Sequence, residues 1–256
     1  MSKLDNALCE IYHMDEIAER EQWLNHIHSL IKLVITVCFI TVTVSFSKYD
    51  LAGVLRMGVY PIVVFIFGEL SFRSALKRLK VILPVVCLIG VFNPFFDRQP
   101  IMEIGGIMVT AGVVSMLTLM VKGIYSVFAS YLLIATTSIE KICYALRLLH
   151  VPAVIVTQIL LAYRYISLLL EEASRMMQAY SLRAPNQKGV HFKVWGSLVG
   201  QLLLKSIDRA NEVYESMLLR GYQGEFPYAA KGFFRVRDCV YLGVWFVIFF
   251  CLRVMI

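Results

Sequence analysis

Long apolar runs separated by short polar stretches dominate the chain. The runs cover residues 29–46, 52–70, 81–96, 104–121 and 239–256. Each approaches the ~17–25 residues with which a helix crosses the hydrocarbon core of a bilayer. The fourth run continues to Thr137 beyond an interruption at Lys122-Gly123, but two full crossings would need ~40 residues. We therefore predict about five transmembrane helices, with the fourth ending near Val121.

A different pattern occupies residues 138–238, where apolar side chains recur every three or four positions. This spacing predicts amphipathic helices over residues 138–149, 152–183 and 192–220. On the second of these, Glu171 and Glu172 stand one helical turn before Arg175, which predicts two ion pairs on its surface. Because such charges are costly in lipid, we expect this helix to lie along the membrane surface and not to cross it.

The distribution of basic residues orients these segments. Most of the 25 Lys and Arg residues fall before the first run, between residues 73 and 80, or after residue 121. Basic loops remain in the cytoplasm, and the N-terminal segment lacks the features of a cleavable signal peptide. We expect a multi-pass protein with a cytoplasmic N-terminus. It comprises a cytosolic segment (1–28), a four-span region (29–121), a cytosolic or interfacial region (122–238) and a final span (239–256).

Composition supports an all-α integral membrane protein. Of the 256 residues 59% are hydrophobic, and the mean hydropathy is +0.70. Soluble domains contain only ~45–50% apolar residues. The formal net charge is +7, but the basic residues flank apolar runs and do not form one soluble basic face. The charge therefore follows membrane orientation and does not indicate a nucleic-acid partner.

Cysteine and histidine do not suggest a metal site. The six cysteines stand singly without C-x-x-C spacing, which argues against a zinc site or a disulfide framework. His26 and His28 would project about 200° apart on a helix, which is poor geometry for chelation. We interpret them, together with His13, as ordinary residues near the membrane. The sequence predicts no catalytic residues and no metal bound by this chain.

Two of the amphipathic helices end in the same short motif. Leu182-Arg183-Ala184 ends the first, and Leu219-Arg220-Gly221 ends the second. A cation at a helix C-terminus interacts favourably with the helix dipole by ~0.3–1 kcal/mol, which is one account of both arginines. The other account is that each guanidinium donates to carboxylates or carbonyls of a partner. The residues alone leave both accounts open. We expect the two tips to lie next to each other in the cytosolic region.

At these residues the chain resembles the transmembrane T components of energy-coupling factor transporters, and among them the cobalt-type CbiQ branch. The resemblance is carried by Gln158–Glu172, Ser181–Ala184 and Leu219–Phe226, and it extends to Met14–Ala18 near the N-terminus. The paired arginine endings are typical of T components in general. The first and third stretches favour the cobalt branch. Pro185 follows the first motif where glycine follows the second arginine, so the two helix ends should differ.

The resemblance implies a non-catalytic coupling subunit in the cell membrane of a bacterium or archaeon. Its tips would dock to two ABC ATPase subunits, which use ATP and Mg²⁺, while this chain binds no cofactor. A CbiM-like substrate-binding S component, with or without a CbiN-like subunit, would bind cobalt or nickel. The candidate ATPase-coupling residues are Leu182, Arg183, Ala184, Leu219, Arg220 and Gly221, and the candidate supporting residues are Arg164, Glu171, Glu172, Gln223 and Glu225.

Two alternatives to a cobalt-type subunit stay open from the sequence. One is a T component that serves vitamin-binding S components. The other is a self-sufficient secondary transporter or channel, which predicts inverted repeats and polar residues at mid-membrane. The sequence contains no Gly-x-x-x-x-Gly-Lys-Ser/Thr phosphate loop, so ATP hydrolysis would belong to another chain.

Overall fold

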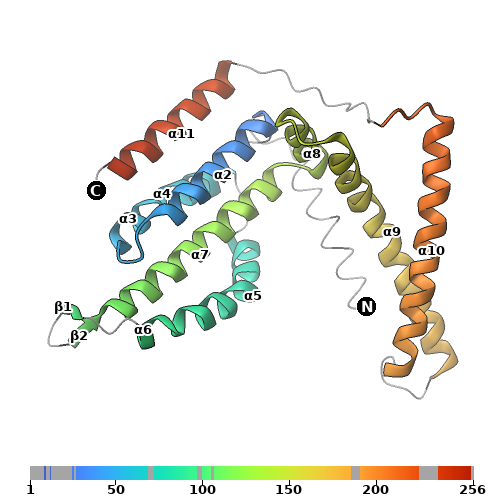
Figure 1. Cartoon of the computed structure of the whole chain (residues 1–256), viewed down its shortest axis with the longest axis horizontal. Coiled ribbons are helices and arrows are strands. Elements are labelled where there is room, and N and C mark those ends of the chain that lie inside the picture. The colour runs from blue at the N-terminus through green and yellow to red at the C-terminus, as the bar shows by residue number, and fades with distance from the viewer. Residues whose placement is uncertain are drawn as a thin grey trace. The chain divides into compact units, whose positions relative to one another are not determined.

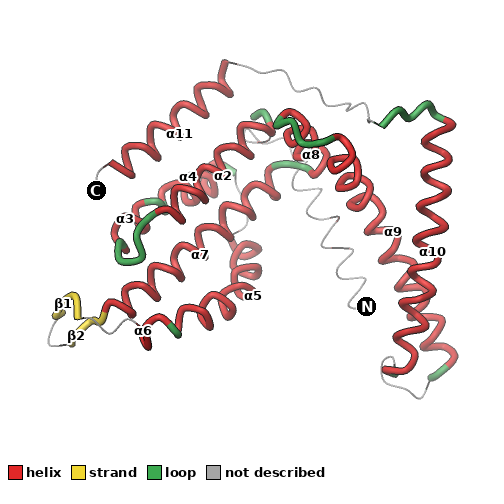
Figure 2. Tube along the Cα trace, viewed as in Figure 1, coloured by secondary structure: helices red, strands yellow, loops and turns green. Residues whose placement is uncertain are grey.

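The computed structural model describes residues 9, 12, 25, 27–68, 72–96, 100–104, 107–185, 191–224 and 236–254. Their secondary structure is helical apart from one short β-hairpin (Figure 2), which confirms the predicted all-helical class. The chain divides into two compact units. We call residues 18–138 and 232–256 the core unit, and residues 1–17 and 139–231 the hairpin unit.

Helix α7 (Ala111–Thr136) is the centre of the core unit (Figure 1). At ~1.5 Å per residue its 26 residues extend about 39 Å, which exceeds the thickness of a bilayer core. Helix α11 (Val236–Val254) packs against α2 and α3. The helices in contact with α7 are α2 (Ser29–Ser45), α3 (Leu51–Arg56), α4 (Val59–Phe67), α5 (Phe72–Val91) and α6 (Asn93–Phe96).

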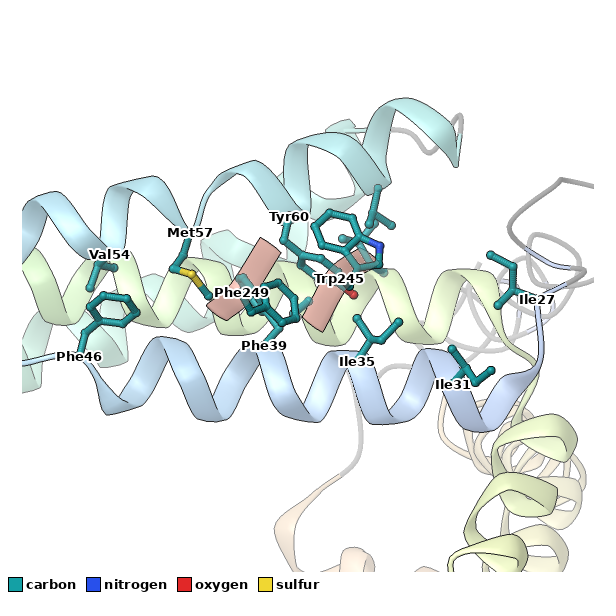
Figure 3. Close-up of a cluster of buried hydrophobic side chains, with 13 residues drawn as sticks. Ile27, Ile31, Ile35, Phe39, Phe46, Val54, Met57, Tyr60, Trp245 and Phe249 are labelled. Atoms are coloured by element: carbon teal, nitrogen blue, oxygen red, sulfur yellow. The ribbon is translucent and has the colours of Figure 1, made fainter. Parts of the chain in front are cut away.

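An aromatic cluster joins α2, α4 and α11 (Figure 3). The ring of Phe39 stacks on Tyr60 with centroids 4.5 Å apart, and Trp245 meets Tyr60 edge-on at 4.8 Å. Phe249 lies within 6 Å of all three rings. Such pairs add ~0.5–1.5 kcal/mol each beyond the burial of their surface. The cluster therefore fixes the C-terminal helix against helices near the start of the chain.

Two lysines cap the ends of the antiparallel helices α2 and α7. Lys32, only 6% exposed, donates from Nζ to the carbonyl oxygen of Thr136 at 2.7 Å, at the end of α7. Lys122 donates to the carbonyl oxygens of Val44 and Phe46 at 3.0 and 2.6 Å, at the end of α2. The last carbonyls of a helix lack partners within it and carry the negative end of its dipole. Each lysine thus satisfies the end of the neighbouring helix.

Helix α7 differs from our expectation that a crossing ends near Val121. The helix continues without a break through Lys122-Gly123, and the ammonium group of Lys122 is bound by carbonyls at the end of α2. Gly123 permits close packing of α5, since a Cβ there would lie 3.1 Å from Val86. Lys32 lies near the start of α2, whereas Lys122 contacts the end of α2. The prediction that the crossing ends near Val121, with Lys122 at the start of the cytosolic or interfacial region, is therefore wrong, because both residues lie inside α7.

The second apolar run, predicted as one span, forms two short helices. α3 ends at Arg56 and α4 begins at Val59, with a turn at Met57-Gly58 between them. The turn lies against α7, where a Cβ on Gly58 would stand 2.5 Å from the hydroxyl of Tyr125. The hydropathy of the run gives no sign of this break, because the turn contains no polar side chain.

The region between the second and fourth runs also differs from the prediction. The basic stretch 73–80, expected as a loop, is part of α5, and Pro84 lies inside that helix without ending it. The expected loop 97–103 contributes to a hairpin of β1 (Pro100–Ile104) and β2 (Ile107–Thr110), in which Ile104 pairs with Ile107. Strand β2 occupies residues that we had assigned to the start of the fourth span.

The core unit exposes many large apolar side chains that a water-soluble protein would bury. At least half of the surface of each is exposed on α2, α4, α5 and α11: Val44, Ile62, Ile66, Phe67, Leu88, Val247 and Phe250. Among the described helices α7 and α9 are long and apolar enough to cross a membrane, by length and composition alone. These surfaces are suited to contact with lipid.

In the described part of the hairpin unit, three helices lie close to their predicted bounds. They are α8 (Ile139–Leu148), α9 (Ala153–Arg183) and α10 (Phe192–Leu219). Pro152 is the N-cap residue of α9, one position before the helix that we expected it to begin. A short connection after Arg183 makes α9 and α10 antiparallel (Figure 1).

Candidate functional site

An ion pair fixes the register of α9 against α10. Lys205 on α10 donates from Nζ to Glu172 on α9. Arg175 lies 3.7 Å from Glu171 and 3.9 Å from Glu172, which confirms the two predicted ion pairs on α9. The sequence did not reveal Lys205 as a partner of Glu172, because the register of two helices cannot be read from either helix alone.

Glu172 is held ionised by this arrangement. The hydrogen bond from Lys205 lowers the pKa of the Glu172 carboxyl below its ordinary value of 4.5. The charges of Lys205 and Arg175 act in the same direction, while partial loss of solvent opposes them. The ion pair between α9 and α10 is therefore intact at neutral pH.

The end of α10 is a Schellman motif. Gly221 has φ +78° and its N–H donates to the carbonyl of Leu218 at 2.9 Å, while the N–H of Tyr222 donates to Met217 at 3.0 Å. A residue with a side chain rarely adopts a positive φ, so glycine suits this position. The predicted role of Gly221 in ending the helix is confirmed. Leu219, 90% exposed, and Arg220 project from this rigid end.

The end of α9 is built differently, as Pro185 had indicated. Among the described residues, the last turn is closed by the N–H of Ala184, which donates to the carbonyl of Tyr180 at 3.0 Å, and Ala184 has φ −130°. Leu182, 83% exposed, and Arg183 nevertheless project into solvent as their counterparts do on α10. Both motifs thus present one exposed leucine and one exposed arginine.

The two motifs lie at opposite ends of the hairpin, not next to each other as we had expected. The pair Glu172–Lys205 marks the same level on both helices. At ~1.5 Å per residue, Arg220 lies about 22 Å beyond Lys205, and Arg183 lies about 16 Å beyond Glu172 in the opposite direction. Antiparallel helices necessarily place their C-terminal ends apart. The spacing along the hairpin is therefore nearly 40 Å.

A groove of about 810 Å³ separates α9 from α10. Apolar side chains such as Leu161, Leu168, Val213 and Met217 line it together with charged ones. The candidate residues Glu171 and Glu172 lie here, and Lys205, Asp208, Arg209 and Glu212 were not singled out from the sequence.

A second, smaller groove of about 350 Å³ brings together Arg164 and Arg220. Arg209 also lines it and pairs with Glu212 at 3.2 Å. Of the other candidates, Gln223 is exposed beyond the end of α10 and Glu225 lies outside the described residues. Arg164 therefore lines the same groove as Arg220, at the end of α10. Among the described residues, no supporting candidate shares either groove with Arg183.

In the described part of the chain, no three His, Cys, Asp or Glu side chains converge as metal ligands. His28 is buried and its Nδ1 accepts from the N–H of Leu30 at 3.3 Å, so it caps the start of α2. His13 and His26 lie outside the described residues.

The sequence is similar to known proteins. The model of the CbiQ family, described as cobalt transport protein, matches residues 20–228. The chain belongs to this family. It is therefore a membrane component of a transport system. The resemblance that rested on the helix-end motifs is confirmed.

Three relatives of this CbiQ-family chain illustrate the range of the family. An uncharacterized protein of Methanocaldococcus jannaschii is 29% identical over 229 residues, 86% of this chain and 78% of the relative. The cobalt transport protein CbiQ of Salmonella typhimurium is 27% identical over 154 residues, 54% of this chain and 67% of the relative. The nickel permease LarQ of Lactiplantibacillus plantarum is 30% identical over 91 residues, 36% of this chain and 33% of the relative.

Proposed function

We propose that this chain is the coupling subunit of an energy-coupling factor ABC importer. It transmits the motion of two ATPase subunits to a separate substrate-binding membrane subunit. The observation that carries the proposal is the pair of exposed Leu-Arg tips at opposite ends of one helical hairpin. Two tips nearly 40 Å apart suit two separate ATPase subunits better than one shared groove.

The proposed topology has five crossings, formed by α2, the α3–α4 pair, α5, α7 and α11. The N-terminus then lies in the cytoplasm, and α7 returns the chain to the cytoplasm at Thr136, just before α8. Helix α9 passes the length and composition test for a span, but Glu171, Glu172 and Arg175 occupy its second half. We place α9 and α10 at the cytoplasmic surface, where these charges remain hydrated.

The substrate of the complex is proposed to be cobalt or nickel, bound by a CbiM-like S component, with or without a CbiN-like subunit. The named functions of the Salmonella and Lactiplantibacillus relatives support a divalent metal. ATP and Mg²⁺ belong to the ATPase subunits, and this chain acts without a catalytic residue or cofactor of its own. A vitamin-binding S component among its native partners would contradict the metal assignment.

Purification from the native host tests the coupling role. We expect tagged chain to carry two ATPase subunits and an S component with it. Replacing both Arg183 and Arg220 by alanine should remove the ATPases and leave the S component, because only the tips are altered. Arg175→Ala is the matched control, since this exposed arginine pairs within its own helix. Retention of the ATPases by the double variant would contradict the proposal.

A further inference from the structure

Three arginines line one groove near the C-terminal end of α10. Arg164 comes from α9, and Arg209 and Arg220 come from α10. Along α9 the lining residues Leu161, Arg164 and Tyr165 are spaced by three and four positions, so they share one helix face. The two helices thus present these guanidinium groups to the same space of about 350 Å³.

The groove carries an excess of positive charge. Among the described residues that line it, Glu212 is the only acidic one, and it pairs with Arg209 at 3.2 Å. Within the described residues no carboxylate forms a salt bridge with Arg164 or Arg220. Two guanidinium groups that share a small groove repel each other. A ligand with negative charge relieves this repulsion and satisfies both.

The tip of α9 does not share either of the two grooves described above. The nearest described arginine before Arg183 is Arg175, which is two turns away and paired with Glu171 and Glu172. Among the described residues, neither groove between α9 and α10 includes Arg183. The two tips therefore share a motif but differ in their surroundings.

We propose that Arg164 and Arg220 together bind one acidic segment of an ATPase subunit, so that the two tips dock with unequal strength. The proposal rests on the coupling role proposed above. The partner segment carries at least two carboxylates, because a guanidinium binds a carboxylate through two parallel hydrogen bonds. Leu161, Tyr165, Val213 and Met217 supply an apolar lining that would exclude water around these contacts. The tip of α9 binds the second ATPase through Arg183 without a second arginine.

An anionic lipid headgroup is the other source of negative charge near this surface. The structure favours the protein segment, because Arg220 belongs to the Leu-Arg-Gly end whose leucine is 90% exposed beside the groove. A headgroup would use the arginines but would have no need of a rigid helix end. The experiment below distinguishes these sources.

A double-mutant cycle on the full chain tests the proposal. We measure, in detergent, the affinity with which the host's ATPase subunits bind variants of this chain. The variants are Arg164→Ala, Arg220→Ala, Arg183→Ala and their pairs. Loss of a hydrogen bond to a charged group lowers affinity roughly tenfold, which we expect for Arg164→Ala. The effects of Arg164→Ala and Arg220→Ala should be coupled. The double variant should bind the ATPases at least roughly threefold more tightly than the product of the two single losses of affinity predicts. Arg164→Ala and Arg183→Ala should combine without coupling.

Two further variants sharpen the cycle. Arg164→Lys keeps the charge but loses the fork of donors, so it should restore only part of the affinity. Arg175→Ala should bind ATPases as wild type does, since Arg175 does not line the smaller groove. Helical content is compared for every variant; all these side chains are exposed, so folding should be preserved.

The outcomes separate this proposal from the coupling role. If Arg220→Ala weakens ATPase binding and Arg164→Ala does not, or if their two losses of affinity simply multiply, the groove is excluded as a joint binding site. The coupling role then still stands. If neither tip variant weakens binding, both proposals fail. If Arg164→Ala lowers binding to phosphatidylglycerol vesicles while ATPase affinity is unchanged, the groove is a lipid site and the proposal is overturned.

Discussion

The core unit and the hairpin unit are both built mainly from helices, but their helices pack in different ways. In the core unit Phe39, Tyr60, Trp245 and Phe249 pack into one cluster that joins three helices. In the hairpin unit α9 and α10 meet through Glu172 and Lys205 and leave grooves between them. The comparison shows that the core unit is stabilised by its own packing, whereas α9 and α10 of the hairpin unit leave grooves and many side chains exposed.

The largest expected effect is in the aromatic cluster. Phe39→Ala should lower the free energy of unfolding by ~3–5 kcal/mol, because the fully buried ring leaves a cavity. Val199→Ala on α10 is the matched change in the hairpin unit. Its side chain is 54% exposed, so the change should stay within ~0.5 kcal/mol. Thermal unfolding in detergent measures both, and equal losses would contradict the contrast between the units.

The next effect concerns the buried lysine of the core unit. Lys32→Met should cost ~1.5–3 kcal/mol, because it removes a charged hydrogen bond and leaves the Thr136 carbonyl without that donor. Lys77→Met, at an exposed position on α5, is the control and should be nearly neutral. The same thermal assay applies. If Lys32→Met left the free energy of unfolding unchanged, Lys32 would merely reach the membrane edge and would not stabilise the end of α7.

A smaller effect is expected at the end of α10. Gly221→Ala should destabilise the last turn by ~1–2 kcal/mol, because alanine is strained at φ +78°. Gly196→Ala, inside α10 where an added Cβ meets nothing within 4 Å, should stabilise the helix by ~0.5–1 kcal/mol. Hydrogen exchange at residues 217–222 reports the difference. Equal protection in both variants would contradict the Schellman motif as the cause of rigidity.

The smallest effect depends on pH. The pKa of Glu172 is lowered in the folded state, so its stabilising pair with Lys205 is complete above the ordinary pKa of 4.5 and is lost as pH falls through the folded value. Spin labels on exposed sites of α9 and α10 should report a wider distance distribution on acidification. Lys205→Ala should show the wider distribution already at neutral pH. No change in either condition would mean that the pair does not hold the helices together.

The sequence predicted those features that depend on local spacing. The periodic apolar positions gave α8, α9 and α10 within about a residue, and Gly221 gave the end of α10. The sequence did not predict features that depend on contacts between distant segments. Lys122 suggested the end of a crossing, because its partners, the carbonyls of Val44 and Phe46 at the end of α2, are distant in sequence.

The candidate site shows the same division between local and distant information. The motifs around Arg183 and Arg220 could be found in the sequence, but their separation follows from the antiparallel hairpin and the register set by Glu172 and Lys205. The association of Arg164 with Arg220 likewise appears only when α9 and α10 are paired. Their exposed positions are consistent with a docking role that the helix-dipole account does not require.

Metal uptake into liposomes tests the central claim that the hairpin unit transmits ATP-driven motion. The complete complex is reconstituted with ATP and radioactive cobalt, and compared with a complex assembled at high ATPase concentration from the Arg183→Ala/Arg220→Ala chain. We predict uptake only with ATPases and ATP, and at least a roughly tenfold loss with the double variant, since each tip supplies charged contacts. Uptake by the chain alone without ATP, or full uptake by the double variant, would contradict the account.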